Sequence, residues 1–126
     1  MVNDIPVDKN EDLELPIPTI WRAKISEIVS IIRKVPDLNF NNISYVDKMD
    51  PKSIRFISAA LTDYGGDIDP ASMPTWATSV YRWMNGYWQV LVDLYSGGEP
   101  TDLVLFMRVV EIGGEYRFCV ESIHVP

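Results

Sequence analysis

Residues with catalytic potential are few and isolated in this chain. His124 is the single histidine and Cys119 the single cysteine among 126 residues, and neither has a partner at a recognisable motif spacing. A nucleophilic thiol needs an accessible, electropositive setting, and a zinc site needs several clustered ligands. Asp67 and Asp69 lie two residues apart, but a calcium loop needs more ligands at fixed steps. We therefore predict a protein that is not an enzyme and that uses no cofactor or metal.

The second chemical feature is an excess of carboxylates. The chain has 18 acidic and 11 basic residues, and residues 67–126 carry a net charge of −5. This balance argues against nucleic acid as the partner and favours a cationic protein, because clustered carboxylates attract cations and accelerate encounter. A simpler interpretation is that the charges only keep the protein soluble.

We predict a partner-binding surface where the turns at 63–69 and 93–102 meet. Trp76, which is expected to lie in an irregular segment and to be partly exposed, and Tyr95 would serve as aromatic anchors. The carboxylates of this predicted surface are Asp63, Asp67, Asp69, Asp93, Glu99 and Asp102.

Two helices are expected in the first half of the chain. Apolar residues recur at helical spacing from Trp21 to Val35, which predicts a helix over 19–35 that Pro36 stops. Ile20, Val29 and Ile31 would widen its buried face. Asp50-Pro51 is a start signal and Gly65-Gly66 a stop signal, so a second helix is predicted between them. Asp69-Pro70 repeats the start signal and predicts a single turn with Asp69 as N-cap.

The spacing of apolar residues changes to two at about residue 78. Asn85-Gly86 predicts a tight hairpin that pairs Trp83 with Trp88 and Tyr81 with Val90. Further strands are expected over 103–111 and 116–125, joined at Gly113-Gly114, with Leu105 opposite Ser122. The predicted fold class is α+β: a four-stranded antiparallel meander with two N-terminal helices packed on one face.

The ends of the chain suggest its organisation and location. Residues 1–18 are acidic and rich in proline, which predicts a loosely held arm or a segment that orders on a partner, followed by one domain over 19–126. The sequence shows neither a secretory signal nor an apolar run of about 20 residues, so we expect a cytoplasmic protein without membrane contact.

Charged and polar side chains are expected on the sheet face that the helices leave open. The loop at 96–102 leaves the register between the second and third strands undetermined, and a one-residue slip would move Arg108 to the other face. The face can be a solvated surface or a docking surface with aromatic anchors. If the sheet curls into a cone, the same side chains would line a pocket: Arg82, Asp93, Arg108, Arg117, Glu121 and His124.

Four stretches resemble a small bacterial domain family of unknown function: YWQVLVDLY at 87–95, DLVL at 102–105, YRF at 116–118 and SIHVP at 122–126. The resemblance extends over 19–126 and is strongest in the last 45 or so residues. It implies a fold rather than a reaction and supplies no catalytic residue. In size and acidity the chain is also similar to immunity proteins of toxin delivery systems, including contact-dependent growth inhibition.

These observations predict a toxin-neutralising immunity protein. It would bind and block a basic toxin domain, such as a nuclease whose cationic substrate groove an acidic protein can fill. The alternative is a small-molecule-binding or enzymatic domain with a cone-shaped α+β pocket. An accessory domain that self-associates is a third reading, and the sequence leaves the oligomeric state and the order of the 1–18 arm open.

Overall fold

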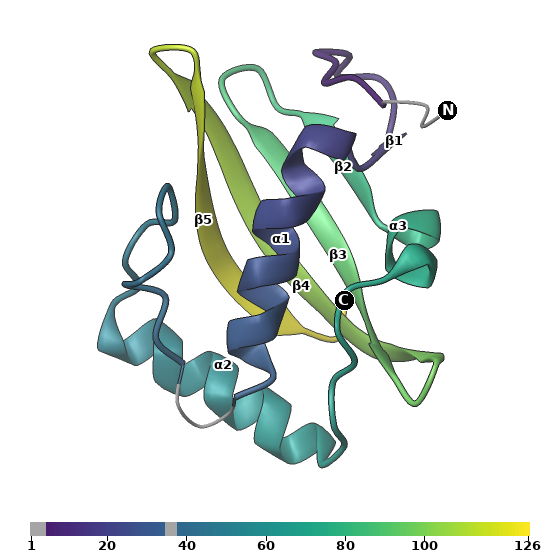
Figure 1. Cartoon of the computed structure of the whole chain (residues 1–126), viewed down its shortest axis with the longest axis vertical. Coiled ribbons are helices and arrows are strands. Elements are labelled where there is room, and N and C mark those ends of the chain that lie inside the picture. The colour runs from purple at the N-terminus through teal and green to yellow at the C-terminus, as the bar shows by residue number, and fades with distance from the viewer. Residues whose placement is uncertain (1–4, 35–37) are drawn as a thin grey trace.

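The fold is α+β, as predicted, with a single antiparallel sheet (Figure 1). The computed structural model describes residues 5–34 and 38–126. The five strands lie in the order β1-β2-β3-β4-β5, and every neighbouring pair is antiparallel. In chain order the elements are β1 Leu15–Pro16, α1 Thr19–Ile32, α2 Pro51–Tyr64, α3 Met73–Thr78, β2 Val80–Trp83, β3 Trp88–Ser96, β4 Glu99–Ile112 and β5 Glu115–His124. The sheet therefore has one strand more, and the chain one helix more, than the sequence predicted.

The first helix forms where apolar residues recur at helical spacing, as predicted. Trp21, Ile25, Ile28 and Ile32 form one stripe of α1 that is fully buried against the sheet. The prediction that Ile20 widens this buried stripe was wrong, because Ile20 is 68% exposed. The predicted residues 33–34 lie beyond the last helical residue, whereas the predicted end at 35–36 lies outside the described residues.

The second helix begins and ends at the predicted signals. The Asp50 carboxylate accepts a hydrogen bond from the Ser53 N–H at 2.8 Å and satisfies one of the free amides of the first turn. Gly65 terminates α2 in the left-handed conformation, with φ of 78°. Ile57 and Leu61 are the buried residues of this helix, and they join the same core as α1.

The prediction for the third helical segment was wrong in its start. Ser72, not Asp69, is the N-cap of α3, and its N–H donates to the Thr75 hydroxyl at 3.1 Å. Pro74 lies within the first helical turn, where a proline costs no hydrogen bond, so the helix does not stop there and has six residues in all. Asp69 is left with a different role, described below.

The first hairpin has the predicted register. Trp83 pairs with Trp88 and Tyr81 with Val90, and both turn residues have positive φ, 57° at Asn85 and 136° at Gly86. The register between β3 and β4 places Gln89 opposite Arg108. This pairing puts Arg108 on the same face as Gln89 and decides the alternative that the sequence left open.

The last hairpin departs from prediction at a bulge. Val109 pairs with Phe118 and Met107 with Val120, as expected from a tight turn at Gly113-Gly114. The register then shifts between Phe106 and Met107, so Leu105 pairs with Ile123 rather than with Ser122. The extra residue turns the Ile123 side chain into the core, where it is fully buried.

The hydrophobic core lies between the sheet and the helices. In Figure 1, α1 runs along the front of the sheet and α2 crosses its lower end, where it contacts β5. Trp21 is the centre of an aromatic cluster: its ring meets those of Tyr81, Trp88, Tyr116 and Phe118 edge-on, with centroids 5.2–6.3 Å apart. Within the described residues, no helix combines the length and apolar character needed to cross a membrane.

The N-terminal arm is not loosely held over its described part. Leu15 and Pro16 pair with β2 as the edge strand β1, and Ile17 is fully buried. Farther back, the N–H of Ile5 donates to the Thr19 hydroxyl at 2.7 Å, and the N–H of Thr19 donates to the Ile5 carbonyl at 3.0 Å. Ile5 and residues 15–17 are therefore in contact with the rest of the described structure.

Candidate partner-binding site

The loop after α2 lies against the turn between β3 and β4. The carboxylate of Asp69 accepts hydrogen bonds from the N–H groups of Gly97 at 3.0 Å and Gly98 at 2.8 Å. The N–H of Asp69 donates to the Tyr95 carbonyl at 2.7 Å, and the Ser96 hydroxyl donates to the Asp67 carbonyl. The predicted acidic surface requires the turns at 63–69 and 93–102 to meet, and these hydrogen bonds join them directly.

One arginine helps to hold this loop in place. Nε of Arg33, just beyond the end of α1, donates to the Ile68 carbonyl at 2.7 Å. The side chain of Ile68 is buried in the core. The loop is therefore held by backbone hydrogen bonds, by the Asp69 carboxylate and by the buried Ile68 side chain, whereas Asp67 is exposed.

An apolar groove lies between α2 and the ends of β4 and β5. Its volume is about 480 Å³. Asp63 and Asp102 line it, and within the described residues neither carboxylate forms an ion pair. Phe56 and Val125 supply exposed apolar surface, 67% and 61% exposed. The full lining is Phe56, Ala59, Ala60, Asp63, Tyr64, Asp102, Leu103, Ile123, His124 and Val125.

The predicted residues divide into those at this end of the molecule and those elsewhere. Asp63 and Asp102 lie in the groove, whereas Asp67, Asp69 and Glu99 lie at or beside the β3–β4 turn. Asp93 instead lies within β3, pairs with Val104 and has its N–H bonded to the Ser79 hydroxyl at 2.9 Å.

The two predicted aromatic anchors are less accessible than an anchor needs to be. Tyr95 is only 8% exposed, and its hydroxyl shares a hydrogen bond with Thr78 at 3.1 Å. The register shift between Asp93 and Tyr95 explains this burial, because it breaks the alternation and buries both Leu94 and Tyr95. Trp76 is half-buried against the core, with the Arg22 guanidinium 5.5 Å from its ring.

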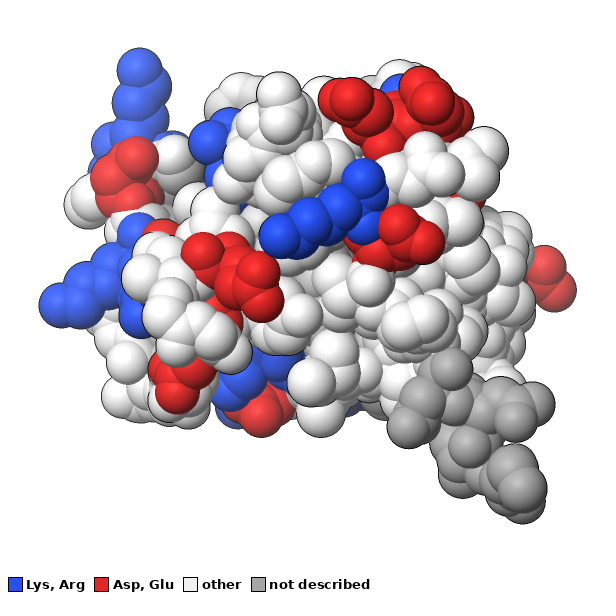
Figure 2. Space-filling model, turned by 90° about the horizontal axis from the view of Figure 1, so that it is seen from above, with Lys and Arg blue, Asp and Glu red and all other residues white. Residues whose placement is uncertain are grey.

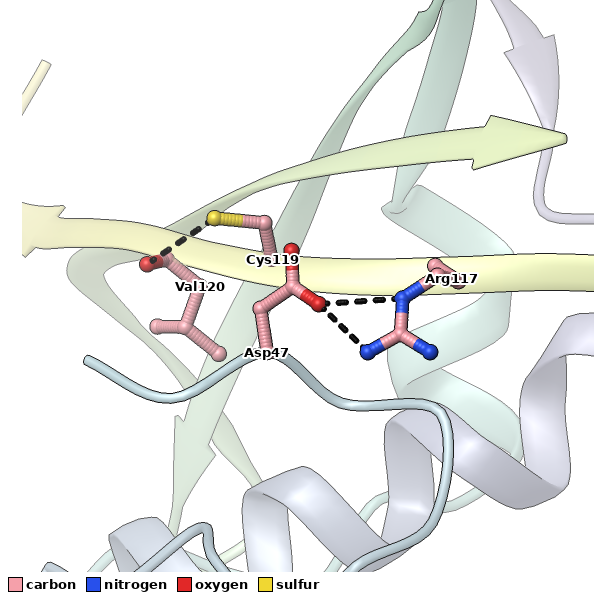
Figure 3. Close-up of polar contacts among 4 residues, drawn as sticks. All are labelled: Asp47, Arg117, Cys119 and Val120. Carbon is pink, nitrogen blue, oxygen red and sulfur yellow. Dashed lines mark hydrogen bonds and ion pairs between the residues drawn. The ribbon is translucent and has the colours of Figure 1, made fainter. Parts of the chain in front are cut away.

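The arginines of the alternative pocket lie on the open sheet face instead. The Arg108 guanidinium lies over the Tyr87 ring, with its Cζ 4.1 Å from the ring centre, and its Nη2 is 3.5 Å from the Glu121 carboxylate. Arg117 holds Asp47 through two hydrogen bonds of 2.8 and 3.1 Å, as Figure 3 shows. Arg108 and Arg117 are thus each paired with a carboxylate on the surface.

Cys119 and His124 are both engaged in local contacts. The Cys119 thiol is half-buried beside the carbonyl of Val120 (Figure 3), and burial, with Asp47 and Glu121 nearby, raises its pKa. A raised pKa disfavours the reactive thiolate. The His124 ring stacks on Phe106 with centroids 4.2 Å apart, and its Nδ1 lies 3.0 Å from the Ser122 hydroxyl. Across residues 5–34 and 38–126, no group of three or more His, Cys, Asp or Glu side chains could hold a metal ion.

The apolar part of the site was absent from the sequence prediction. Phe56 stands outside the buried stripe of α2, and an aromatic residue on the solvent side of a helix was the available signal. Val125 gave no such signal, because the bulge in β5 determines how the end of that strand meets α2.

The fold and the groove together define a small α+β domain with an acidic, partly apolar surface at one end. Residues 32–126 match the family described as a domain of unknown function (DUF7668), and the chain belongs to this family. The match confirms the expected relation to a family of unknown function, and it contains both the groove and the β3–β4 turn. We found no curated protein and no solved structure that matches the chain.

Proposed function

We propose that this protein is a non-catalytic binding domain that covers a cationic segment of a partner protein. The observation that carries the proposal is the groove, where Asp63 and Asp102 accompany the exposed apolar surface of Phe56 and Val125. Apolar contact supplies affinity when a side chain is buried, and carboxylates at the edge select lysine or arginine beside it. The occupant would be a segment with an apolar anchor flanked by basic residues.

The acidic turn beside the groove supports the same class of partner. Asp67 and Glu99 are exposed at this end, and the formal charge of the whole chain is −7. Such a field raises the rate at which a basic protein meets this surface, and salt reduces the effect. Figure 2 shows the opposite end, where acidic and basic side chains lie next to one another.

In its biological role, the domain would act as an immunity protein that blocks a basic toxin. A nuclease toxin binds phosphates through a positively charged groove, and an acidic protein seated there excludes the substrate. The contacts of Cys119 and His124 also suit a binding role better than a catalytic one, since burial raises the pKa of the thiol and the imidazole is stacked on Phe106.

The test is binding to the product of the adjacent gene, measured by calorimetry at low and high salt. We expect the double substitution Asp63→Lys and Asp102→Lys to weaken binding at least about tenfold, because like charges then face each other. Glu11→Lys with Glu14→Lys makes the same change of charge at exposed residues outside the groove and should leave most of the affinity. Equal losses for the two double variants, or no binding by the wild type, would refute the proposal.

Protection of cells tests the immunity role separately. Co-expression of the wild-type chain should restore the growth of cells that make the adjacent gene product, whereas the groove variant should not. Binding without protection would support the binding function but reject the role as an immunity protein.

A further inference from the structure

A second candidate site lies at the opposite end of the molecule, independent of the groove. There the ammonium of Lys9 lies 5.2 Å from the centre of the Trp83 ring and 5.7 Å from that of Trp88. The Glu111 carboxylate is 3.7 Å from the same nitrogen. Two indole faces and one carboxylate are a suitable environment for a cation, because the rings attract it and the carboxylate neutralises it.

The backbone before Lys9 is held by two buried side chains. The Asp8 N–H donates to the Tyr81 hydroxyl at 2.7 Å, and the Trp88 indole N–H donates to the Asp8 carbonyl at 2.9 Å. Tyr81 and Trp88 are each 1% exposed, so their polar atoms need a partner within the protein. Residues 6–8 provide it, since the Tyr81 hydroxyl also donates to the Pro6 carbonyl at 3.4 Å.

These contacts would accept any chain of similar shape. Backbone groups and the Lys9 side chain make the polar contacts, and the partly buried Val7 side chain packs against the core. Recognition therefore depends on an extended segment with an apolar residue two positions before a lysine. The chain's own segment is held weakly at the lysine, because Lys9 and Glu111 are 58% and 39% exposed and such ion pairs contribute about 0–1 kcal/mol. Residues 11–14, which join the segment to β1, are exposed.

We propose that Tyr81, Trp83, Trp88 and Glu111 form a binding site for an extended, lysine-bearing segment of a partner protein. Residues 6–9 occupy this site in cis and act as a built-in competitor. The tether gives them an effective concentration of the order of millimolar, so a separate segment binds well only when the arm is released. The site would bind a cationic side chain, and the net charge of −7 of the whole chain also attracts cationic partners.

The main test uses the full chain with a protease recognition sequence in place of the exposed residues 11–14. The probe is a labelled peptide with the sequence of residues 5–12, IPVDKNED. After cleavage we expect the peptide to exchange with the released arm and to bind at least about tenfold more tightly than to the uncut chain. The Trp88 indole N–H resonance, followed by NMR, should return to its uncut position when the peptide is bound.

Lysine recognition is tested with two matched changes. The peptide with methionine at the lysine position should bind about three- to tenfold more weakly to the cut chain, and so should the intact peptide to a Glu111→Lys variant. Glu115→Lys makes the same change of charge on the same hairpin and should leave binding unchanged. Peptide binding that ignores these changes, or no binding at millimolar peptide, would overturn the proposal.

A second experiment does not depend on the cut chain remaining folded. In the uncut chain, Lys9→Met removes the ammonium from the indole rings, so the labelled peptide should bind this variant about three- to tenfold more tightly than the wild type. Equal affinities would count against the site. Dimers that form by exchange of arms as concentration rises, seen by light scattering, would assign the site to a second copy and reject a separate partner.

Discussion

Asp67 and Asp69 show how two similar residues acquire different roles at the scale of a single side chain. The Asp69 carboxylate receives the N–H groups of Gly97 and Gly98, which have φ of 60° and 80°. Glycine adopts this left-handed conformation without the steric cost of a Cβ, and two adjacent N–H groups can then face one anion. Asp67 contributes only its backbone carbonyl to the turn. Its carboxylate is therefore the one available to a partner.

A pair of alanine substitutions distinguishes these roles. Asp69→Ala should lower the free energy of unfolding by about 1.5–3 kcal/mol, because two hydrogen bonds to a charged group are lost. Asp67→Ala should change it by less than about 0.5 kcal/mol, as is usual for an exposed side chain. Urea denaturation measures both values. Similar losses for the two variants would show that the Asp69 carboxylate does not hold the turn.

Secondary-structure elements in this protein depend strongly on their ends. The Asp50 carboxylate caps α2, and the hydrogen bonds from the Ser53 N–H and hydroxyl lower the pKa of this carboxyl group. A lowered pKa in the folded state means that the ionised cap stabilises the fold above the ordinary aspartate pKa of about 3.9. This contribution is lost as the pH falls through the lowered pKa.

The cap of α2 therefore predicts a specific dependence on pH. Asp50→Ala should have a lower Tm than the wild type at neutral pH, and the difference should shrink as the pH falls below about 3.9. Asp50→Asn keeps a capping oxygen that does not titrate, so its Tm should stay close to that of the wild type at low pH. Thermal melts from pH 7 to pH 2 measure both. A constant difference between Asp50→Ala and the wild type would contradict an ionised cap.

The whole molecule is stabilised by the contact of α1 with the sheet. Ile28 is fully buried in this contact, whereas Ile20 on the same helix is 68% exposed. Their comparison separates the effect of burial from the effect of helix propensity, because the same substitution is made in the same element.

Substitution of these two isoleucines tests that view of the core. Ile28→Ala should lower the free energy of unfolding by about 2–5 kcal/mol through lost burial and a residual cavity. Ile20→Ala should change it by less than about 0.5 kcal/mol. Chemical denaturation of both variants measures the difference. A large loss at Ile20 would indicate that the exposed face of α1 is also packed.

The two ends of the molecule differ in what they offer to a partner. One end of the molecule combines an apolar groove with the carboxylates of Asp63 and Asp102, and the other holds a lysine of the chain's own arm over two neighbouring indole rings. Both arrangements suit a cationic protein, but they use different residues. Variants at Asp63 and at Glu111 can therefore test them independently.

Local signals in the sequence determined much of the architecture. The Asn85-Gly86 turn and the caps of α2 act between residues close in the chain, so their partners can be read directly. The alternation of apolar residues likewise indicated a buried face for the strands, but it left the side of Arg108 open and did not show the register shifts in the sheet. The predicted acidic surface required the turns at 63–69 and 93–102 to meet. The sequence did not show the hydrogen bonds that hold these two turns together.

Tertiary structure alone decided the features that depend on residues far apart. The bulge opposite Phe106 turns Ile123 into the core, the shift after Asp93 buries Tyr95, and Asp8 meets Tyr81 and Trp88 across the sheet. A one-residue change in register moves a side chain to the other face, and local propensity does not record it. The sequence thus determined the elements and the excess negative charge. Only the packing of distant segments produced the groove and the site where Lys9 meets Trp83, Trp88 and Glu111.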